Sequence, residues 1–261
     1  MLAASRLPGR WSLRLVLAVA VISGVSLVTQ VLRYGFDVDP PGLNSLERWF
    51  FVDREMGVPA WFSAVLLFAI GERLWQVGTA VRATGGRWYP QWRLLAVVFV
   101  YLSLDELTEI HEQTIRPLKD LFQLSGVLGF AWVVVAVPLL LVLGGLLLPF
   151  LRALPSSTRW AFLLSAACYL GGAVGLEMVG AVLFQDLGVP VVTTTEVGGV
   201  STVTEGVHLG GMLYAVVVGA EEALEMLGLV LFLGAVSATL RRTLLTAVPA
   251  AHPEELLTPS A

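Results

Sequence analysis

Long runs of apolar residues, separated by short charged stretches, make up most of the chain. A helix that crosses the apolar part of a membrane needs about 20 largely apolar residues. Six segments meet this requirement, so we expect an all-α fold, a polytopic membrane helix bundle of about six transmembrane helices. The predicted helices cover residues 12–33, 59–81, 92–112, 127–151, 158–184 and 210–240. We expect one transmembrane domain over residues 1–245 and a short polar tail over 246–261.

Arginines lie before the first predicted helix, between the second and third, between the fourth and fifth, and after the sixth. They are Arg6, Arg10, Arg14, Arg82, Arg87, Arg93, Arg152, Arg159, Arg241 and Arg242. Short cytoplasmic segments of membrane proteins are enriched in Arg and Lys. With six helices all four segments fall on one side, so we expect both termini in the cytoplasm and the chain in the cytoplasmic membrane.

The two longest loops lie on the opposite, outer side. Residues 34–58 include Leu46-Glu47-Arg48-Trp49-Phe50-Phe51, which is typical of a short interfacial helix with aromatic anchors. Residues 189–205 are rich in Val and Thr around Gly198-Gly199, which predicts a small β-hairpin over the outer face.

Composition supports the membrane assignment and excludes several classes of protein. The chain is 56% hydrophobic and 14% charged, whereas soluble domains carry about 25% charged residues. The single cysteine, Cys168, allows no internal disulfide. No basic patch interleaved with aromatic residues indicates nucleic-acid binding, and the expected surroundings are membrane lipids, with a homo-oligomer or a larger membrane complex left open. The basic, apolar N-terminal segment resembles a signal peptide but lacks a convincing cleavage site, so we expect an uncleaved helix.

Acidic residues and one histidine inside the predicted helices are the main candidates for chemistry. Asp105, Glu109 and Glu112 would share one face of a continuous helix, and the fifth and sixth helices bring carboxylates to the same height in the outer half. The full candidate set is Asp105, Glu106, Glu109, His111, Glu112, Glu177, Glu221, Glu222 and Glu225. Glu72 lies deeper and next to Arg73, which favours a structural or interfacial pair.

Several carboxylates at one depth in a membrane are costly unless they are protonated, paired, solvated or bound to a cation. The only titratable bases near them are His111 and His208. Simpler interpretations remain for each group: a solvated helix end for Glu109, His111 and Glu112, a lone protonated carboxyl for Glu177, and a loop histidine for His208. The continuing apolar sequence argues against a solvated face for Asp105 and the acidic residues of the sixth helix.

A divalent metal is one way to neutralise such a cluster. Oxygen ligands with one histidine suit iron, manganese, magnesium, calcium or zinc, and the sequence does not distinguish among them. His111 is not part of a Glu-x-x-His pattern like that of di-iron helix bundles, because Glu109 and Glu112 are both off that spacing. The cluster could instead share protons.

Three segments resemble an uncharacterised group of bacterial multi-pass membrane proteins. They are Asp53-Arg54-Glu55-Met56-Gly57-Val58-Pro59-Ala60-Trp61-Phe62-Ser63, Ser103-Leu104-Asp105-Glu106 with His111-Glu112, and Glu221-Glu222-Ala223-Leu224-Glu225-Met226-Leu227-Gly228. The resemblance implies a fold and no activity. It suggests that Asp53, Glu55 and Trp61, at the outer mouth of the second helix, belong near the same site, and His208 is a further candidate there.

Three functional classes can use an acidic site in the outer half of the membrane. A metalloenzyme could activate water or dioxygen against a lipid-like or quinone-like substrate. A transporter or channel could relay protons or metal ions. A structural or assembly subunit could use the carboxyls for hydrogen bonds between helices. The absence of internal repeats in the sequence slightly disfavours a carrier.

Overall fold

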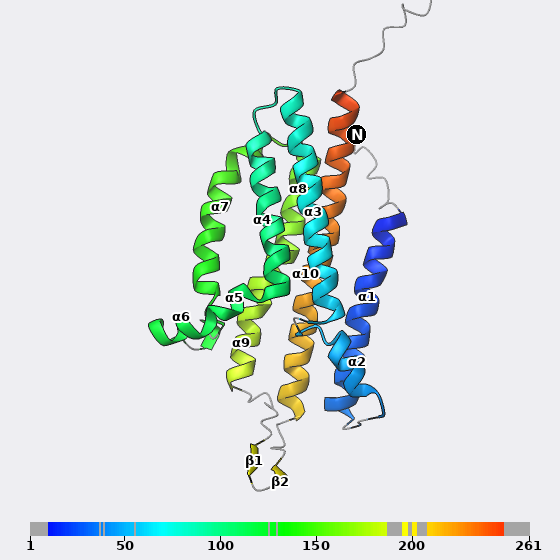
Figure 1. The fold of residues 1–261 in the computed structure, drawn as a ribbon, viewed down its shortest axis with the longest axis vertical. Helices are drawn as coiled ribbons and strands as arrows, with labels where there is room; N and C mark the ends of the chain where they lie inside the picture. Colours follow the sequence, from blue (N-terminus) through cyan, green and yellow to red (C-terminus); the bar gives the residue numbers. More distant parts are fainter. Residues whose placement is uncertain are drawn as a thin grey trace, which may run out of the picture.

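The computed structural model describes residues 10–36, 38, 40–54, 56–124, 126–128, 130–186, 195–197, 200–202 and 208–247. In this part of the chain nearly all residues are helical (Figure 1). The first half contains α1 (Arg10–Gln30), η1 (Val31–Gly35), α2 (Leu43–Phe50), α3 (Val58–Ala83), α4 (Tyr89–Thr108), α5 (Ile110–Gln113) and α6 (Ile115–Phe122). The second half contains η2 (Gly126–Leu128), α7 (Val133–Ala153), α8 (Ser156–Leu170), η3 (Gly171–Leu176), α9 (Glu177–Asp186), β1 (Thr195–Val197), β2 (Val200–Thr202) and α10 (His208–Ala247).

Within the described residues, five helices are long and apolar enough to span a membrane. They cover Arg10–Gly35, Val58–Ala83, Val133–Ala153, Ser156–Leu183 and Gly211–Thr246. The sixth expected span corresponds to α4, which has 20 residues but carries Arg93, Asp105 and Glu106. These charges lower its average hydropathy, although the helix lies beside α3 in the bundle (Figure 1).

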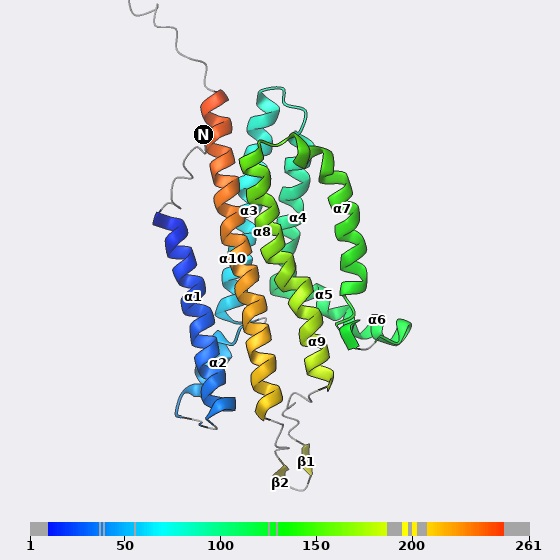
Figure 2. The same ribbon diagram turned by 180° about the vertical axis from the view of Figure 1, so that it is seen from behind.

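Helix α10 forms the centre of the bundle and packs against α1, α3, α8, η3 and α9 (Figures 1 and 2). Its 40 residues correspond to about 60 Å at 1.5 Å per residue, so it is longer than the residues 210–240 expected from the sequence. Apolar side chains from α3 and α10 form the centre of the core, including Ile70, Leu74, Met226 and Val236, each 0% exposed. Proline in the first turn of both α3 and α4 suits a helix start, where its missing N–H has no helical partner.

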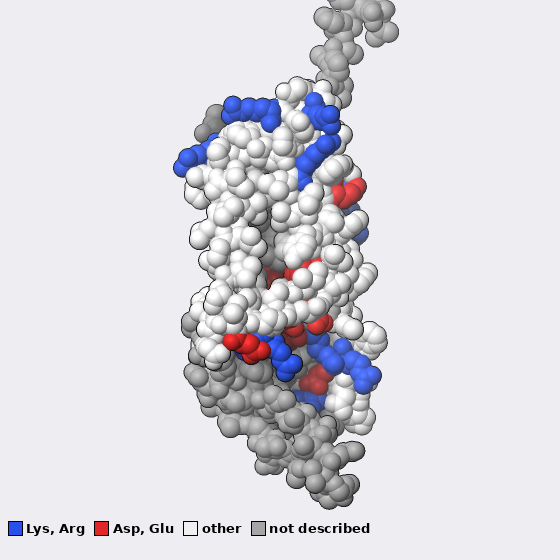
Figure 3. Space-filling view, turned by 60° about the vertical axis from the view of Figure 1, so that its left-hand side comes forward, with Lys and Arg blue, Asp and Glu red and all other residues white. Residues whose placement is uncertain are grey.

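One half of the bundle is filled with aromatic rings. Trp92 lies edge-on to Phe150 at 4.9 Å and to Phe162 at 6.0 Å. The ring centroids of Phe162 and Phe232 are 4.5 Å apart, and Phe232 stacks on Phe99 with a centroid distance of 4.9 Å. This aromatic core lies between the helix ends where α3, α7 and α10 finish and α4 and α8 begin. Basic side chains are visible at those ends (Figure 3), which we call the arginine-rich end. They carry Arg82, Arg87, Arg93, Arg152, Arg159, Arg241 and Arg242.

The opposite end carries the short elements. Helix α2 coincides with the expected interfacial segment and is held to α1 and η1, since Glu47 pairs with Arg33 at 2.5 Å and accepts from Gln30 at 3.2 Å. Strands β1 and β2 pair antiparallel, with Thr195 opposite Thr202, inside the segment for which the sequence predicts a hairpin. Their position over the outer face of a membrane stays a prediction.

Candidate functional site

The prediction of one continuous helix over residues 92–112 is wrong, because α4 ends at Thr108. Glu109 adopts a left-handed conformation, with φ 54° and ψ 36°, and its N–H donates to the Asp105 carbonyl at 2.8 Å. The chain then turns into α5 and into α6, which the sequence did not predict. Asp105, Glu109 and Glu112 therefore do not share one helical face.

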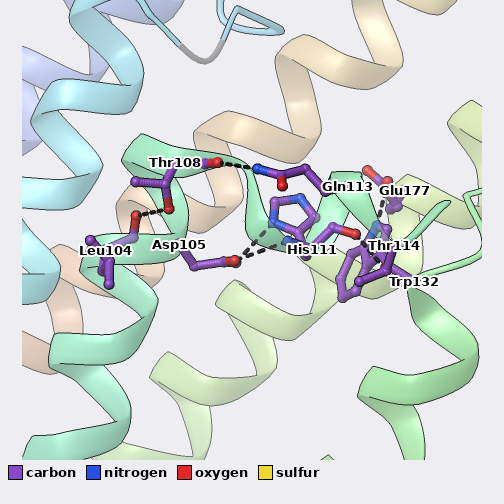
Figure 4. A network of polar contacts seen from close by, with 8 residues as sticks. All are labelled: Leu104, Asp105, Thr108, His111, Gln113, Thr114, Trp132 and Glu177. Carbon is purple, nitrogen blue, oxygen red and sulfur yellow. Dashed lines mark hydrogen bonds and ion pairs between the residues drawn. The ribbon is translucent and has the colours of Figure 1, made fainter. Parts of the chain in front are cut away.

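Asp105 stabilises this turn with its side chain (Figure 4). Its Oδ1 accepts the backbone N–H of His111 at 3.0 Å, and its Oδ2 lies 2.8 Å from His111 Nδ1. The His111 and Asp105 side chains are 29% and 13% exposed. A single carboxylate thus fixes both the backbone and the ring of His111 at the beginning of α5.

Trp132 connects this turn to the second half of the chain (Figure 4). Its ring lies edge-on to the His111 ring at 5.0 Å, and its Nε1–H donates to Glu177 Oε1 at 3.0 Å. Glu177 is the first residue of α9, directly after the π-helical turn η3. The contact brings α5, the start of α7 and α9 together.

The carboxyl groups of Glu177 and Glu221, on α9 and α10, lie within hydrogen-bonding range of each other. Glu221 is 6% exposed. Gly180 borders the pair, and a Cβ on it would make ordinary contacts, 4.0 Å from Glu221 Oε2 and 3.8 Å from the Tyr214 ring. A hydrogen bond between two carboxyl groups forms only when one of them carries a proton.

Asp53 lies at the exposed end of the site. Val52 anchors the loop, donating its N–H to Ser26 Oγ at 3.3 Å. The Tyr214 hydroxyl donates toward both Asp53 oxygens at 3.4 and 3.3 Å.

Asp53 as a whole residue is exposed, but the protein atoms gathered around its carboxyl desolvate it. This desolvation, reinforced by the charges of Glu177 and Glu112, outweighs the Tyr214 hydrogen bond and raises the pKa of Asp53 to about 7. Desolvation also raises the pKa of Glu112, with Glu109 and Glu177 adding to it and His111 opposing it.

Tyr169 of α8 lies at the deeper side of the site. It is within electrostatic range of Glu225, Glu106, Glu222 and Asp105. Glu106 in turn interacts with His111 and Asp105, and Glu221 interacts with Glu225 and Asp53. We group the nine side chains that these hydrogen bonds and electrostatic interactions relate to one another as the acidic network: Asp53, Asp105, Glu106, His111, Glu112, Glu177, Glu221, Glu222 and Glu225.

Glu109, at the turn, borders the network through its interaction with Glu112. The other candidates lie away from it or outside the described residues. Trp61 is 61% exposed and lines a groove of about 340 Å³ with Trp49, Met56 and Leu107. Glu72 pairs on the surface with Arg73 and accepts from Gln76, away from the network. Glu55 and the side chain of His208 lie outside what the structure describes.

The sequence did not single out Tyr214, Tyr169 or Trp132. All three count as apolar in a hydropathy pattern, and only the polar tip of each ring marks it as a partner for a buried carboxyl. Such a tip becomes informative once an acidic residue is known to lie opposite. In the described part of the chain, no group of three His, Cys, Asp or Glu side chains is placed to hold a metal ion.

The fold and the acidic network define an all-helical protein with membrane-length helices and polar side chains between them. The chain belongs to the family described as a domain of unknown function, DUF8692, which it matches over residues 13–239. This agrees with the resemblance to an uncharacterised family. Neither the curated proteins nor the solved structures contain a match to the chain, so the family supplies no activity.

Proposed function

We propose that this chain is a six-span membrane protein whose acidic network takes up and releases protons in the outer half of the bilayer. Helix α4 would be the sixth span, with its charged C-terminal turn belonging to the network. The arginine-rich end would face the cytoplasm, in keeping with the distribution of Arg in membrane proteins. Asp53, Glu112 and the two strands would then face outward.

The observation that carries this proposal is the closeness of the Glu177 and Glu221 carboxyl groups, which lie within hydrogen-bonding range of each other. Two ionised carboxylates repel each other, whereas one shared proton turns the repulsion into a charge-assisted hydrogen bond. Tyr214 and Trp132 donate to the neighbouring acids Asp53 and Glu177. Such donors favour the ionised form of the carboxyl that accepts from them, so they leave the shared proton to Glu221.

Access to the network favours proton exchange at one face of the membrane. Asp53 and Glu112 are exposed residues, and they connect through Glu177 to buried Glu221. Toward the arginine-rich end the interior is filled by Trp92, Phe150, Phe162 and Phe232. An apolar aromatic layer is a poor path for protons. We therefore propose a store or relay that serves a reaction or a substrate at the outer face, in preference to a channel.

Amide substitution tests the proposal, because Gln resembles a protonated Glu in shape and cannot ionise. Glu221→Gln and Glu177→Gln should each melt close to the wild-type temperature in detergent, and purified protein should contain no stoichiometric metal. In proteoliposomes with an internal pH dye, an outward pH jump should give no sustained proton flux. Glu72→Gln, outside the network, is the matched control. A large drop in melting temperature together with loss of a bound ion would contradict the proposal.

A second candidate is a divalent metal near His111. Asp105 holds His111 through Nδ1 at 2.8 Å, which is how a carboxylate orients a metal-ligating histidine. Such an ion could activate water for a reaction on a lipid-like substrate that enters by the groove at Trp61. Elemental analysis with Asp105→Asn and His111→Ala tests it. Stoichiometric metal in wild type that is lost from both variants would favour this candidate over proton exchange.

A further inference from the structure

A second site lies at the arginine-rich end, far from the acidic network in the fold. A pocket of about 280 Å³ opens where α3, α4, α7, α8 and α10 meet at their ends. Its wall includes Arg87 from the α3–α4 turn and Arg242 from α10, with the hydroxyl-bearing Thr158 and Thr243. Trp92 and Phe150 form part of its apolar inner wall. The pocket thus has a cationic side and an aromatic side.

The two arginines have weak partners. Arg242 Nη1 donates to Ser157 Oγ at 3.4 Å and Thr158 Oγ1 at 3.5 Å, both long contacts to neutral hydroxyls. The Arg87 guanidinium lies 4.3 Å from the centre of the Trp88 ring. Within the described ranges no carboxylate pairs with either arginine. Two guanidinium groups lining one pocket without a carboxylate partner favour a bound anion, and their planar donors suit phosphate oxygens.

The inner wall restricts the kind of anion. Val81, Trp88, Leu154 and Pro155 line the pocket with partly or largely exposed apolar side chains, whereas Trp92 and Phe150 are buried. A small hydrated anion would leave the exposed apolar surface of the pocket without a partner, whereas an amphiphile would cover it. The pocket also lies at the ends of helices long enough to span a membrane, which is the level of lipid headgroups. Basic pockets between membrane helices on the cytoplasmic side bind anionic lipid headgroups.

We propose that this pocket binds an anionic phospholipid, with the phosphate between Arg87 and Arg242 and the start of an acyl chain against Val81 and Leu154. The lipid would bridge helices that come from both halves of the chain, because Arg87 precedes α4 and Arg242 belongs to α10. Bound lipid therefore stabilises the native bundle.

The test uses the full chain in neutral detergent, titrated with phosphatidylglycerol while melting temperature and retained lipid are measured. Phosphatidylglycerol should raise the melting temperature with saturation, and phosphatidylcholine or inorganic phosphate at equal concentration should not. The double variant Arg87→Gln/Arg242→Gln should bind phosphatidylglycerol about thirtyfold more weakly, given the usual contribution of each basic residue. Arg152→Gln/Arg241→Gln removes the same charge from the same end outside the pocket, and should retain nearly wild-type affinity.

A variant that narrows the pocket separates loss of lipid binding from loss of folding caused by the removed charges. Thr243→Phe keeps both arginines and narrows the pocket, so it should also weaken phosphatidylglycerol binding while the lipid-free melting temperature stays near wild type. Equal losses in the two arginine pairs would show unspecific attraction and overturn the proposal. Full stabilisation by inorganic phosphate alone would identify a free anion as the ligand and overturn the lipid assignment.

Discussion

Glu221 shows how a carboxyl group is accommodated inside this bundle. The residue is 6% exposed, and its carboxyl group lies within hydrogen-bonding range of Glu177 on α9. Removing an ionised carboxylate from water costs several kcal/mol after relaxation of the protein. A proton shared between the two acids would remove most of this cost.

Asp53 predicts how stability depends on pH. Its pKa is raised from 3.8 to about 7 in the folded protein, so between about pH 4 and pH 7 the native state binds more protons on this group than the unfolded chain does. Stability contributed here is therefore present at low pH and lost as pH rises through about 7. Asp53→Asn still accepts from Tyr214 but cannot ionise. Its melting temperature should fall less between pH 5 and pH 8 than that of wild type, with Asp120→Asn on α6 as the control. Identical pH profiles for wild type and Asp53→Asn would contradict this assignment.

Glu109 predicts a backbone effect. Its φ of 54° lies in the left-handed region, which costs a residue with a Cβ roughly 1–2 kcal/mol and costs glycine almost nothing. Glu109→Gly should therefore stabilise the protein by about 1 kcal/mol in denaturant or thermal unfolding. Glu109→Gln removes the charge and keeps the strain. If the Gln variant gained as much as the Gly variant, charge repulsion with Glu112 would be the cause instead.

At the scale of elements, the apolar pattern predicted the helices of membrane-spanning length well. The expected residues 59–81 and 158–184 correspond to α3 (Val58–Ala83) and to the continuous helical segment Ser156–Leu183. The apolar pattern gave the wrong helix boundaries where specific side-chain contacts determine the end of a helix. The break after Thr108 depends on the Asp105–His111 contacts, and α7 begins at Val133 instead of residue 127. Periodicity contains no information on either feature.

The grouping of the acids could be anticipated only in outline. Overlapping heights indicated that α4, α9 and α10 share a site, but which side chains touch depends on helix rotation and on the π-helical turn η3. That turn brings the chain close to α10: a Cβ on Gly172 would lie 2.6 Å from the Glu221 carbonyl oxygen and 2.8 Å from Glu225 Cγ. A sequence pattern cannot reveal such a contact, because a glycine can occur in a helix for several other reasons.

This close approach makes a prediction about packing. Gly172→Ala should destabilise the protein by about 1–3 kcal/mol, the usual cost of overpacking. Gly171→Ala is a matched control on the same turn, since a Cβ there meets nothing within 4 Å, and it should be neutral or slightly stabilising. Equal melting temperatures for the two variants would mean that η3 does not pack against α10 as described.

Charged side chains are distributed unevenly along the length of the whole molecule. Basic side chains lie at the end that contains the aromatic core and again, beside acidic ones, toward the opposite end, and acidic side chains are visible in a hollow at mid-height (Figure 3). The acidic network and the arginine-lined pocket therefore occupy different levels of the same bundle. If the chain spans the membrane with the arginine-rich end inside, the two sites address opposite faces of the bilayer.

Thiol labelling tests this orientation. In a Cys168→Ser background, Ser45→Cys on α2 should react with an impermeant thiol reagent in intact cells. Ser156→Cys, at the start of α8, should react only after the membrane is opened. Both serines are exposed residues, so differences in reactivity report the side of the membrane. Labelling of Ser156→Cys from outside would reverse the orientation and place the acidic network on the cytoplasmic side.

The protonation of the Glu177–Glu221 pair is measured most directly by infrared spectroscopy of the purified protein at neutral pH. The carbonyl stretch of a protonated carboxylic acid is distinct from the bands of a carboxylate, and it shifts on exchange into heavy water. Wild type should show such a band, Glu221→Gln and Glu177→Gln should each weaken it, and Glu72→Gln should leave it unchanged. A spectrum with no protonated carboxyl at neutral pH, or a band unaffected by both network substitutions, would contradict proton storage in the acidic network.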